Sequence, residues 1–107
     1  MTKLASLNLW STKFSDEGIE NLQGMENLTW LNLDNTAVSD EGVKLLKDMN
    51  QLTWLHLGKT KVTDASAAAL KELENLTYLS IRQSGMTDDG YFELDDFFSP
   101  KDCTVER

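Results

Sequence analysis

The sequence predicts a right-handed α/β solenoid with about four full strand–turn–helix rungs and a truncated fifth strand, in a single domain over residues 1–107. The first observation is a leucine column repeated every 24 residues, at Leu4, Leu28, Leu52 and Leu76. The second is that the same interval aligns five further columns. A period of this length is typical of solenoids, in which each repeat buries its apolar face by stacking on its neighbours.

The further columns are apolar, hydroxyl-bearing or acidic, and they keep the same order in every repeat. They are Leu7, Leu31, Leu55 and Leu79; Leu9, Leu33, Leu57 and Ile81; Thr12, Thr36, Thr60 and Ser84; Phe14, Val38, Val62 and Met86; and Asp16, Asp40, Asp64 and Asp88. The repeats therefore span residues 4–27, 28–51, 52–75 and 76–99. A C-terminal strand or cap is expected over residues 100–107.

Each repeat begins with a predicted strand. Around Leu31 and Leu33, apolar and polar residues alternate with a period of two, which is typical of a short strand with one buried face. The interval places such strands near residues 6–8, 30–32, 54–56 and 78–80.

A short helix is predicted after each aspartate column. Ser39, Asp40 and Glu41 supply a capping side chain and acids that suit a first helical turn. Val43, Leu46 and Met49 follow three residues apart, so they form one inward face. The same spacing recurs in the first repeat at Ile19, Leu22 and Met25 and in the third at Ala67, Leu70 and Leu73.

The repeated motif Leu28-x-x-Leu31-x-Leu33-x-x-Thr36-x-Val38 resembles the leucine-rich repeat family, and the resemblance covers residues 4 to about 94. The Thr-x-Val/Phe-Ser/Thr-Asp variant is similar to short bacterial-type repeats. Where the family usually has Asn or Cys, this chain has a hydroxyl, which we expect to bond the turn backbone of a neighbouring rung. The resemblance implies a non-catalytic module that binds another protein or a peptide.

At the C-terminus, the 24-residue register places Pro100, Cys103 and Val105 in the three leucine columns. Cys103 is therefore expected to be a small buried hydrophobe and not a reactive thiol. Phe92 and Phe98 replace polar or small residues of the earlier repeats, so we expect them to cover the C-terminal end of the stack.

The N-terminal edge has no such cover, because Leu4 begins the first repeat almost at the first residue. A bare strand edge with exposed leucines invites pairing with another strand. Two interpretations stay open. The chain is a piece of a longer array, or a second copy caps this edge by self-association.

The candidate binding surface lies between the leucines, because alternate strand residues face away from the core onto the concave side. All three tryptophans fall on that side. Exposed large aromatics that packing does not require are typical of interaction sites. The candidate site residues are Trp10, Trp30, Asn32, Asp34, Trp54, His56, Lys59, Tyr78, Ser80, Arg82 and Gln83.

Two other interpretations compete with protein binding. Strands in register lie about 4.8 Å apart, so Trp30, Trp54 and Tyr78 could stack as a purely structural ladder in a larger array. The same platform, edged by Asn32, His56 and Arg82, also suits the flat face of a carbohydrate.

An enzyme is not predicted. Asp34, His56 and Ser80 superficially suggest a hydrolytic triad, but diagonal neighbours on adjacent strands lie about 7–8 Å apart, too far for the carboxylate to orient the imidazole. One histidine and one cysteine cannot complete a tetrahedral metal site. No phosphate-binding glycine motif is present, and no cofactor is expected.

The net charge of −8 argues against a nucleic acid or an anionic membrane as partner, since both require a basic stripe. The acids concentrate at the predicted helix starts, where they are most simply capping residues and a solvated convex shell. A single cysteine and the lack of an apolar leader favour a cytoplasmic protein. The sequence does not identify the partner.

Overall fold

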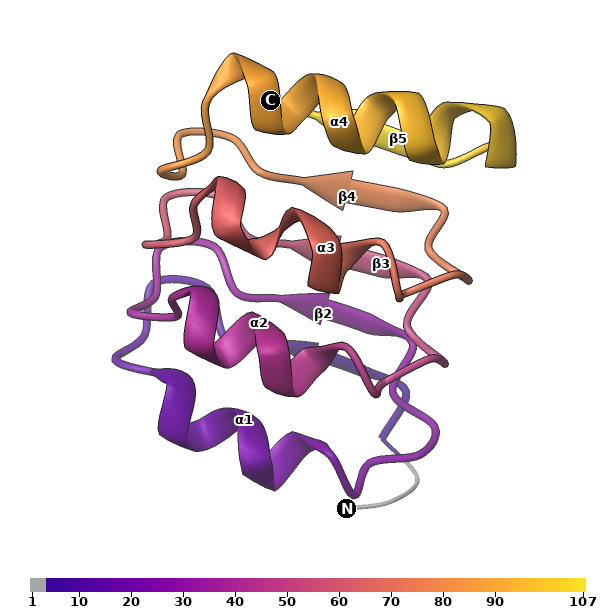
Figure 1. Ribbon diagram of the computed structural model, residues 1–107. Coiled ribbons are helices and arrows are strands. Elements are labelled where there is room, and N and C mark those ends of the chain that lie inside the picture. The colour runs from indigo at the N-terminus through magenta and orange to yellow at the C-terminus, as the bar shows by residue number, and fades with distance from the viewer. Residues whose placement is uncertain (1–3) are drawn as a thin grey trace.

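The computed structural model describes residues 4–107 as one stack of five rungs (Figure 1). The strands are β1 (Ser6–Asn8), β2 (Trp30–Asn32), β3 (Trp54–His56), β4 (Tyr78–Ser80) and β5 (Thr104–Glu106). The helices are α1 (Asp16–Leu22), α2 (Asp40–Leu46), α3 (Ala67–Leu70) and α4 (Asp88–Phe98), with 3-10 turns η1 (Asp64–Ser66) and η2 (Ser99–Lys101). The first four strands match their predicted positions.

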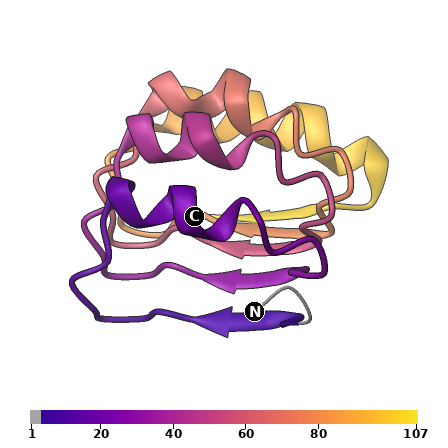
Figure 2. The same cartoon turned by 90° about the horizontal axis from the view of Figure 1, so that it is seen from below.

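All five strands are parallel and follow chain order in one sheet. The register pairs Leu7 with Leu31, Leu31 with Leu55, and Leu55 with Leu79. The helices cover one face of this sheet and leave the other face open (Figure 2). These observations confirm the predicted α/β solenoid.

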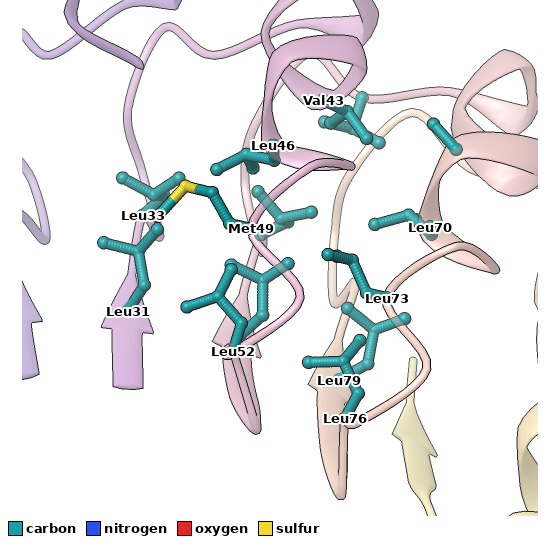
Figure 3. Close-up of a cluster of buried hydrophobic side chains, with 14 of the residues drawn as sticks. Leu31, Leu33, Val43, Leu46, Met49, Leu52, Leu70, Leu73, Leu76 and Leu79 are labelled. Carbon is teal, nitrogen blue, oxygen red and sulfur yellow. The ribbon is translucent and has the colours of Figure 1, made fainter. Parts of the chain in front are cut away.

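The core lies between the sheet and the helices (Figure 3). Leu31, Leu55 and Leu79 from the strands are fully buried, as are Leu46 and Leu70 from the helices. Because a rung has only a short strand and a short helix, its leucines are enclosed by neighbouring rungs and not by their own. Among residues 4–107 the first rung has only one such neighbour. Its Leu4 is accordingly 38% exposed.

The hydroxyl column acts differently from our expectation. Thr36 Oγ1 donates to the carbonyl of Leu33 at 2.7 Å, and Thr60 Oγ1 donates to that of Leu57 at the same distance. The hydroxyls therefore close the turn of their own rung and do not reach a neighbour. The carbonyl three residues earlier lies within reach of the hydroxyl because the chain turns back on itself there. Threonines that do bond the neighbouring rung stand elsewhere, just before the strands, as where Thr77 Oγ1 donates to the carbonyl of Thr53 at 3.0 Å.

The aspartate column provides the contact between rungs. Asp16 accepts hydrogen bonds from the backbone N–H of Ser39 at 2.8 Å and from its hydroxyl at 2.5 Å. Asp40 binds Thr63 of the next rung in the same way, and Asp64 binds Thr87. Each aspartate thus secures the residue that precedes the next rung's helix, a role beyond the capping predicted from the sequence. We call this set the aspartate ladder.

The aspartate ladder explains two of the three glycines at the helix starts, Gly42 and Gly90, whereas a Cβ at Gly18 would meet the ring of Phe14 at 2.3 Å. A Cβ added at Gly42 would lie 2.3 Å from Asp16 Oδ1, and one at Gly90 would lie 2.1 Å from Asp64 Oδ1. In the third rung this position is Ser66, whose hydroxyl donates to Asp40 Oδ1 at 2.5 Å. There the helix begins with the 3-10 turn η1. The position therefore requires either no side chain or one that bonds the aspartate.

Gly42→Ala is expected to lower the free energy of unfolding by about 1–3 kcal/mol, because Asp16 must leave Ser39 to make room for the methyl group. The sign is informative, since Gly→Ala inside a helix ordinarily stabilises it by about 1 kcal/mol. Urea unfolding followed by circular dichroism measures the change. Gly24→Ala is the control, because nothing lies within 4 Å of its added Cβ. Equal behaviour of the two variants would contradict the ladder's steric role.

The register predicted for the fifth strand was wrong by two residues. Leu79 pairs with Val105, and Pro100 is exposed in η2. The reason is that α4 has 11 residues where α1 and α2 have 7, and the chain then needs η2 and a left-handed Asp102 to return to the sheet. The 24-residue interval therefore ends with the fourth rung.

The predicted C-terminal cover is confirmed in part. Phe98 is fully buried, whereas Phe92 is 50% exposed and lies beneath the guanidinium of Arg107. Cys103 is buried, and this burial raises the pKa of its thiol to about 11, which agrees with the predicted unreactive role. Over residues 4–107, no helix has the length and apolar character needed to cross a bilayer.

Candidate functional site

The candidate site is the open face of the sheet, opposite the helices. Trp30, Trp54 and Tyr78 project there from the first position of β2, β3 and β4, and they are register partners. All three side chains are half-buried. Successive residues of a strand point to opposite faces of the sheet. Because the leucine that follows each aromatic residue points toward the helices, the aromatic residue points to the open face.

The aromatic side chains form a continuous stack, which we call the aromatic ladder: Trp30, Trp54, His56 and Tyr78. The ring centroids of Trp30 and Trp54 lie 4.1 Å apart with planes inclined by 10°. On the other side of Trp54, the centroid of His56 lies at 3.8 Å and that of Tyr78 at 5.4 Å. Both faces of Trp54 are therefore covered by other rings.

Tyr78 ends the ladder next to β5. Burial, together with the nearby carboxylate of Glu106, raises the pKa of its hydroxyl above the usual value. The hydroxyl is therefore protonated at neutral pH and remains a hydrogen-bond donor on the open face.

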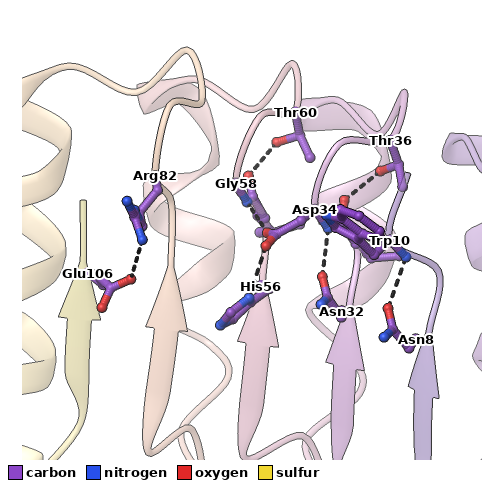
Figure 4. A network of polar contacts seen from close by, with 12 residues as sticks. Asn8, Trp10, Asn32, Asp34, Thr36, His56, Gly58, Thr60, Arg82 and Glu106 are labelled. Atoms are coloured by element: carbon purple, nitrogen blue, oxygen red, sulfur yellow. Dashed lines mark hydrogen bonds and ion pairs between the residues drawn. The ribbon is translucent and has the colours of Figure 1, made fainter. Parts of the chain in front are cut away.

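The distance that we predicted between Asp34 and His56 was wrong. Asp34 Oδ2 lies 3.0 Å from His56 Nδ1, and Asp34 Oδ1 accepts the backbone N–H of Gly58 at 2.7 Å (Figure 4). The diagonal rule describes residues inside strands, whereas Asp34 lies beyond the end of β2 and its side chain reaches across to the third rung. In the second rung the equivalent backbone N–H, that of Asp34, is bound by Asn32 Oδ1 at 2.9 Å. In the third rung the residue equivalent to Asn32 is His56, which has no amide oxygen. The Asp34 carboxylate therefore accepts the backbone N–H of Gly58 in its place.

The Asp34–His56 pair does not extend to a triad. His56 Nε2 is buried, and within residues 4–107 it has no hydrogen-bond partner. Ser80, its register partner on β4, is only 1% exposed. Ser80 was a candidate site residue, but its side chain does not reach the surface.

The remaining candidates gather where the strands end. Trp10, Asp34, Gly58, Lys59, Arg82 and Gln83 line a pocket of about 320 Å³, which we call the strand-end pocket. Lys59 and Gln83 have left-handed backbones, with φ of 54° and 57°. Because the chain turns sharply at these positions in each rung, their side chains project at the rim of the open face.

Two members of this region were missed by the sequence analysis. Glu106 lies 3.6 Å from Arg82 Nη1. It was overlooked because the open face was predicted from the four full repeats only, although the 24-residue interval places Glu106 directly after Arg82 in the same column. Gly58 matters as a close approach, since a Cβ there would lie 2.9 Å from the carbonyl oxygen of Arg82 and 3.0 Å from Asp34 Oδ1. The sequence did offer a signal for Gly58, because this glycine interrupts a column whose other members, Trp10, Asp34 and Arg82, all have long side chains. In the described part of the chain, no three His, Cys, Asp or Glu side chains are grouped as metal ligands.

Comparison with protein families agrees with this geometry. The family model described as leucine rich repeat matches residues 26–86, which is more than half of the chain. This chain belongs to the leucine-rich repeat family. The matched segment contains β2, β3 and β4, and therefore the whole aromatic ladder.

Solved structures of leucine-rich repeat proteins share the fold. A leucine-rich repeat protein of Leptospira interrogans superposes with a TM-score of 0.69 at 20% identity, over 97% of this chain and 25% of that one. An internalin of Listeria monocytogenes gives 0.62 at 23% identity, over 99% of this chain and 35% of that one. This leucine-rich repeat chain thus spans about a quarter to a third of the length of these neighbours. No curated protein matches it.

Proposed function

We propose that this leucine-rich repeat chain is a non-catalytic module that binds another protein or a peptide through the open face of its sheet. The observation that carries the proposal is the placement of the tryptophans. All three lie on the open face or its rim, none belongs to the core, and Trp10 is 61% exposed. Aromatic side chains of this kind supply most of the binding energy in typical protein interfaces.

The aromatic ladder constrains how a partner would bind. Since both faces of Trp54 are covered, a partner meets the ring edges of Trp54 and Tyr78. The face of Trp30 turned away from Trp54 looks toward β1, where the register partner is the small residue Ser6. A flat group from the partner would extend the stack over Ser6.

The size of the surface supports a role within a larger interface. The sheet is five strands wide with about 4.8 Å between strands, so the open face is about 20 Å across. A standard interface takes about 800 Å² from each partner, which exceeds what this face supplies. The structural neighbours are three to four times longer than this chain. We therefore propose that the module acts together with its turns or with further repeats.

Self-association through the open edge of β1 is the alternative way to enlarge the surface. Leu4 is 38% exposed beside this edge, whose hydrogen-bonding groups have no strand partner within residues 4–107. Sedimentation equilibrium distinguishes self-association from the use of turns or further repeats. An apparent mass that stays monomeric at rising protein concentration would contradict self-association.

A carbohydrate-binding surface is the competing function, favoured by the flat stack of Trp30 and Trp54 beside the polar groups of His56 and Arg82. The stacking argues against it, because both faces of Trp54 are covered and the wide tryptophan platform is reduced to the one face of Trp30 that is turned toward β1. Titration with oligosaccharides, followed by tryptophan fluorescence, is expected to show no saturable change. A purely structural ladder is the third candidate, and the following experiment separates it from binding.

Peptides selected from a random library against the intact chain are expected to bind Trp54→Ala about thirtyfold more weakly or worse, corresponding to about 2 kcal/mol for a central aromatic. Fluorescence anisotropy with labelled peptides measures the loss. Phe92→Ala is the matched control, because it removes an exposed aromatic from α4 on the opposite side of the molecule. Selected peptides that bind Trp54→Ala and the parent chain equally would show that the ladder only stabilises the fold.

A further inference from the structure

The strand-end pocket has an electrostatic character opposite to that of the whole chain. The protein carries 18 acids against 10 lysines and arginines. Yet two of those cations, Lys59 and Arg82, line this one pocket together with Trp10, Asp34, Gly58 and Gln83. Local charge matters more than net charge here, because salt screens distant charges beyond about 8 Å at physiological ionic strength.

The acid in the pocket is already engaged. Asp34 Oδ1 accepts the Gly58 N–H at 2.7 Å, and Asp34 Oδ2 lies 3.0 Å from His56 Nδ1. The missing side chain at Gly58 permits this position, since a Cβ there would meet Asp34 Oδ1 at 3.0 Å. The Asp34 carboxylate is thus bound to the floor of the pocket and 24% exposed.

The cations are much less engaged. Within residues 4–107 the Arg82 guanidinium forms one ion pair, to Glu106 at 3.6 Å, and the two side chains are 63% and 42% exposed. Such a long, exposed pair contributes little and can be exchanged for another carboxylate. Lys59 forms no ion pair with any residue between 4 and 107. The pocket therefore presents hydrogen-bond donors that the chain itself leaves open.

We propose that the strand-end pocket binds a carboxylate of the partner peptide, held between the Lys59 ammonium and the Arg82 guanidinium. This inference rests on the proposed function, and it specifies which chemical group of the partner binds at the edge of the open face. The planar guanidinium matches a carboxylate with two parallel hydrogen bonds, and the ammonium adds a further charge-assisted bond.

Trp10 supplies the apolar part of the recognition. It is 61% exposed on the wall of the pocket, so it offers a surface for the methylene stem that carries the carboxylate. An acidic side chain and a free C-terminus both present this group. Because both are the same ligand chemistry, the experiment separates them.

The test is a titration of the intact ¹⁵N-labelled chain, observed by NMR at the Trp10 indole and the Arg82 side chain. The probes are a peptide blocked at both ends with one glutamate, the same peptide with glutamine, and an N-terminally blocked peptide that has no charged side chain but a free C-terminal carboxylate. Saturable shifts are expected with the glutamate peptide or the C-terminal one, and whichever binds identifies the source. The glutamine peptide is expected to bind about tenfold more weakly or worse.

Matched variants locate the site. Arg82→Gln and Lys59→Gln are each expected to weaken carboxylate binding by about tenfold. Lys61→Gln removes the same charge from an exposed residue outside the pocket, and it should bind like the parent chain. Absence of saturable shifts with both carboxylate probes overturns the inference. Equal binding by the Arg82, Lys59 and Lys61 variants overturns it too.

Failure here is distinguishable from failure of the proposed function. If library peptides depend on Trp54 while both carboxylate probes fail, the carboxylate site is wrong and the binding module stands. If carboxylate probes bind through Lys59 and Arg82 but no library peptide depends on Trp54, the pocket stands and the aromatic ladder is structural.

Discussion

Leu55→Ala is expected to lower the free energy of unfolding by about 2–5 kcal/mol, the range for truncating a buried leucine. Leu55 is fully buried at the centre of β3, between Leu31 and Leu79 on the adjacent strands. Its removal leaves a cavity that the short rungs cannot close, because each leucine is held from both sides. Urea unfolding followed by far-ultraviolet circular dichroism measures the loss.

The neighbouring Trp54→Ala is the internal control, since the two residues face opposite sides of the sheet. It removes stacking contacts with Trp30, His56 and Tyr78, but the indole is only half-buried and cross-strand aromatic pairs contribute about 0.2–1 kcal/mol each relative to alanine, so the total loss is on the order of 1 kcal/mol. We therefore expect a loss clearly smaller than that of Leu55→Ala. If Trp54→Ala unfolds as readily, then the tryptophan belongs to the core and the assignment of the open face is wrong.

Asp40→Ala is expected to cost about 2–4 kcal/mol, because it leaves several hydrogen-bond donors without their charged acceptor. Asp40 accepts bonds from the Thr63 N–H at 2.8 Å, the Thr63 hydroxyl at 2.6 Å and the Ser66 hydroxyl at 2.5 Å. Thermal and urea unfolding at neutral pH measure the loss. Asp48→Ala removes an exposed acid from the turn after α2, and as a control it should change stability by less than about 0.5 kcal/mol.

The same variant has a distinctive pH dependence. Burial alone would raise the pKa of Asp40, but the hydrogen bonds from Ser66 and Thr63 outweigh it and lower the pKa below 3.8. The stabilisation is therefore complete above the unfolded-state pKa of about 3.9 and is lost as the pH falls through the folded-state value. The difference between the parent chain and Asp40→Ala should be constant near neutral pH and shrink below about pH 4. A difference that persists in acid would contradict the role of the ionised carboxylate.

The fold could be predicted from the sequence because the repeat provides independent copies of one pattern. Leu31 alone is compatible with a strand or a helix, but its alignment with Leu7, Leu55 and Leu79 leaves only stacked parallel strands. The prediction failed where the repeat changes. The longer α4 displaces Val105 by two residues. Pro100 is a signal that the helix ends before it, but a proline does not indicate how many residues the chain then needs to return to the sheet.

The open face was predicted by the alternation of the strands, whereas its internal bonds were not. Strand geometry places Asp34 and His56 but does not describe how far a side chain reaches once its strand has ended. The aspartate ladder escaped prediction for a related reason. An aspartate before a helix is a common capping residue, so its bond to Ser39 of the next rung, 23 residues later, has no local signature.

The aspartate ladder also has a consequence for how such chains evolve. The upper surface of one rung and the lower surface of the next are joined by the same chemical pair, an aspartate with a serine or threonine, whether at Asp16 and Ser39 or at Asp40 and Thr63. A gene segment encoding one whole unit can therefore be duplicated or deleted, and the surfaces that come together already match. The number of rungs can thus change without disturbing the joining chemistry, and residues of the open face can be substituted without disturbing the ladder, so the two properties are free to vary separately.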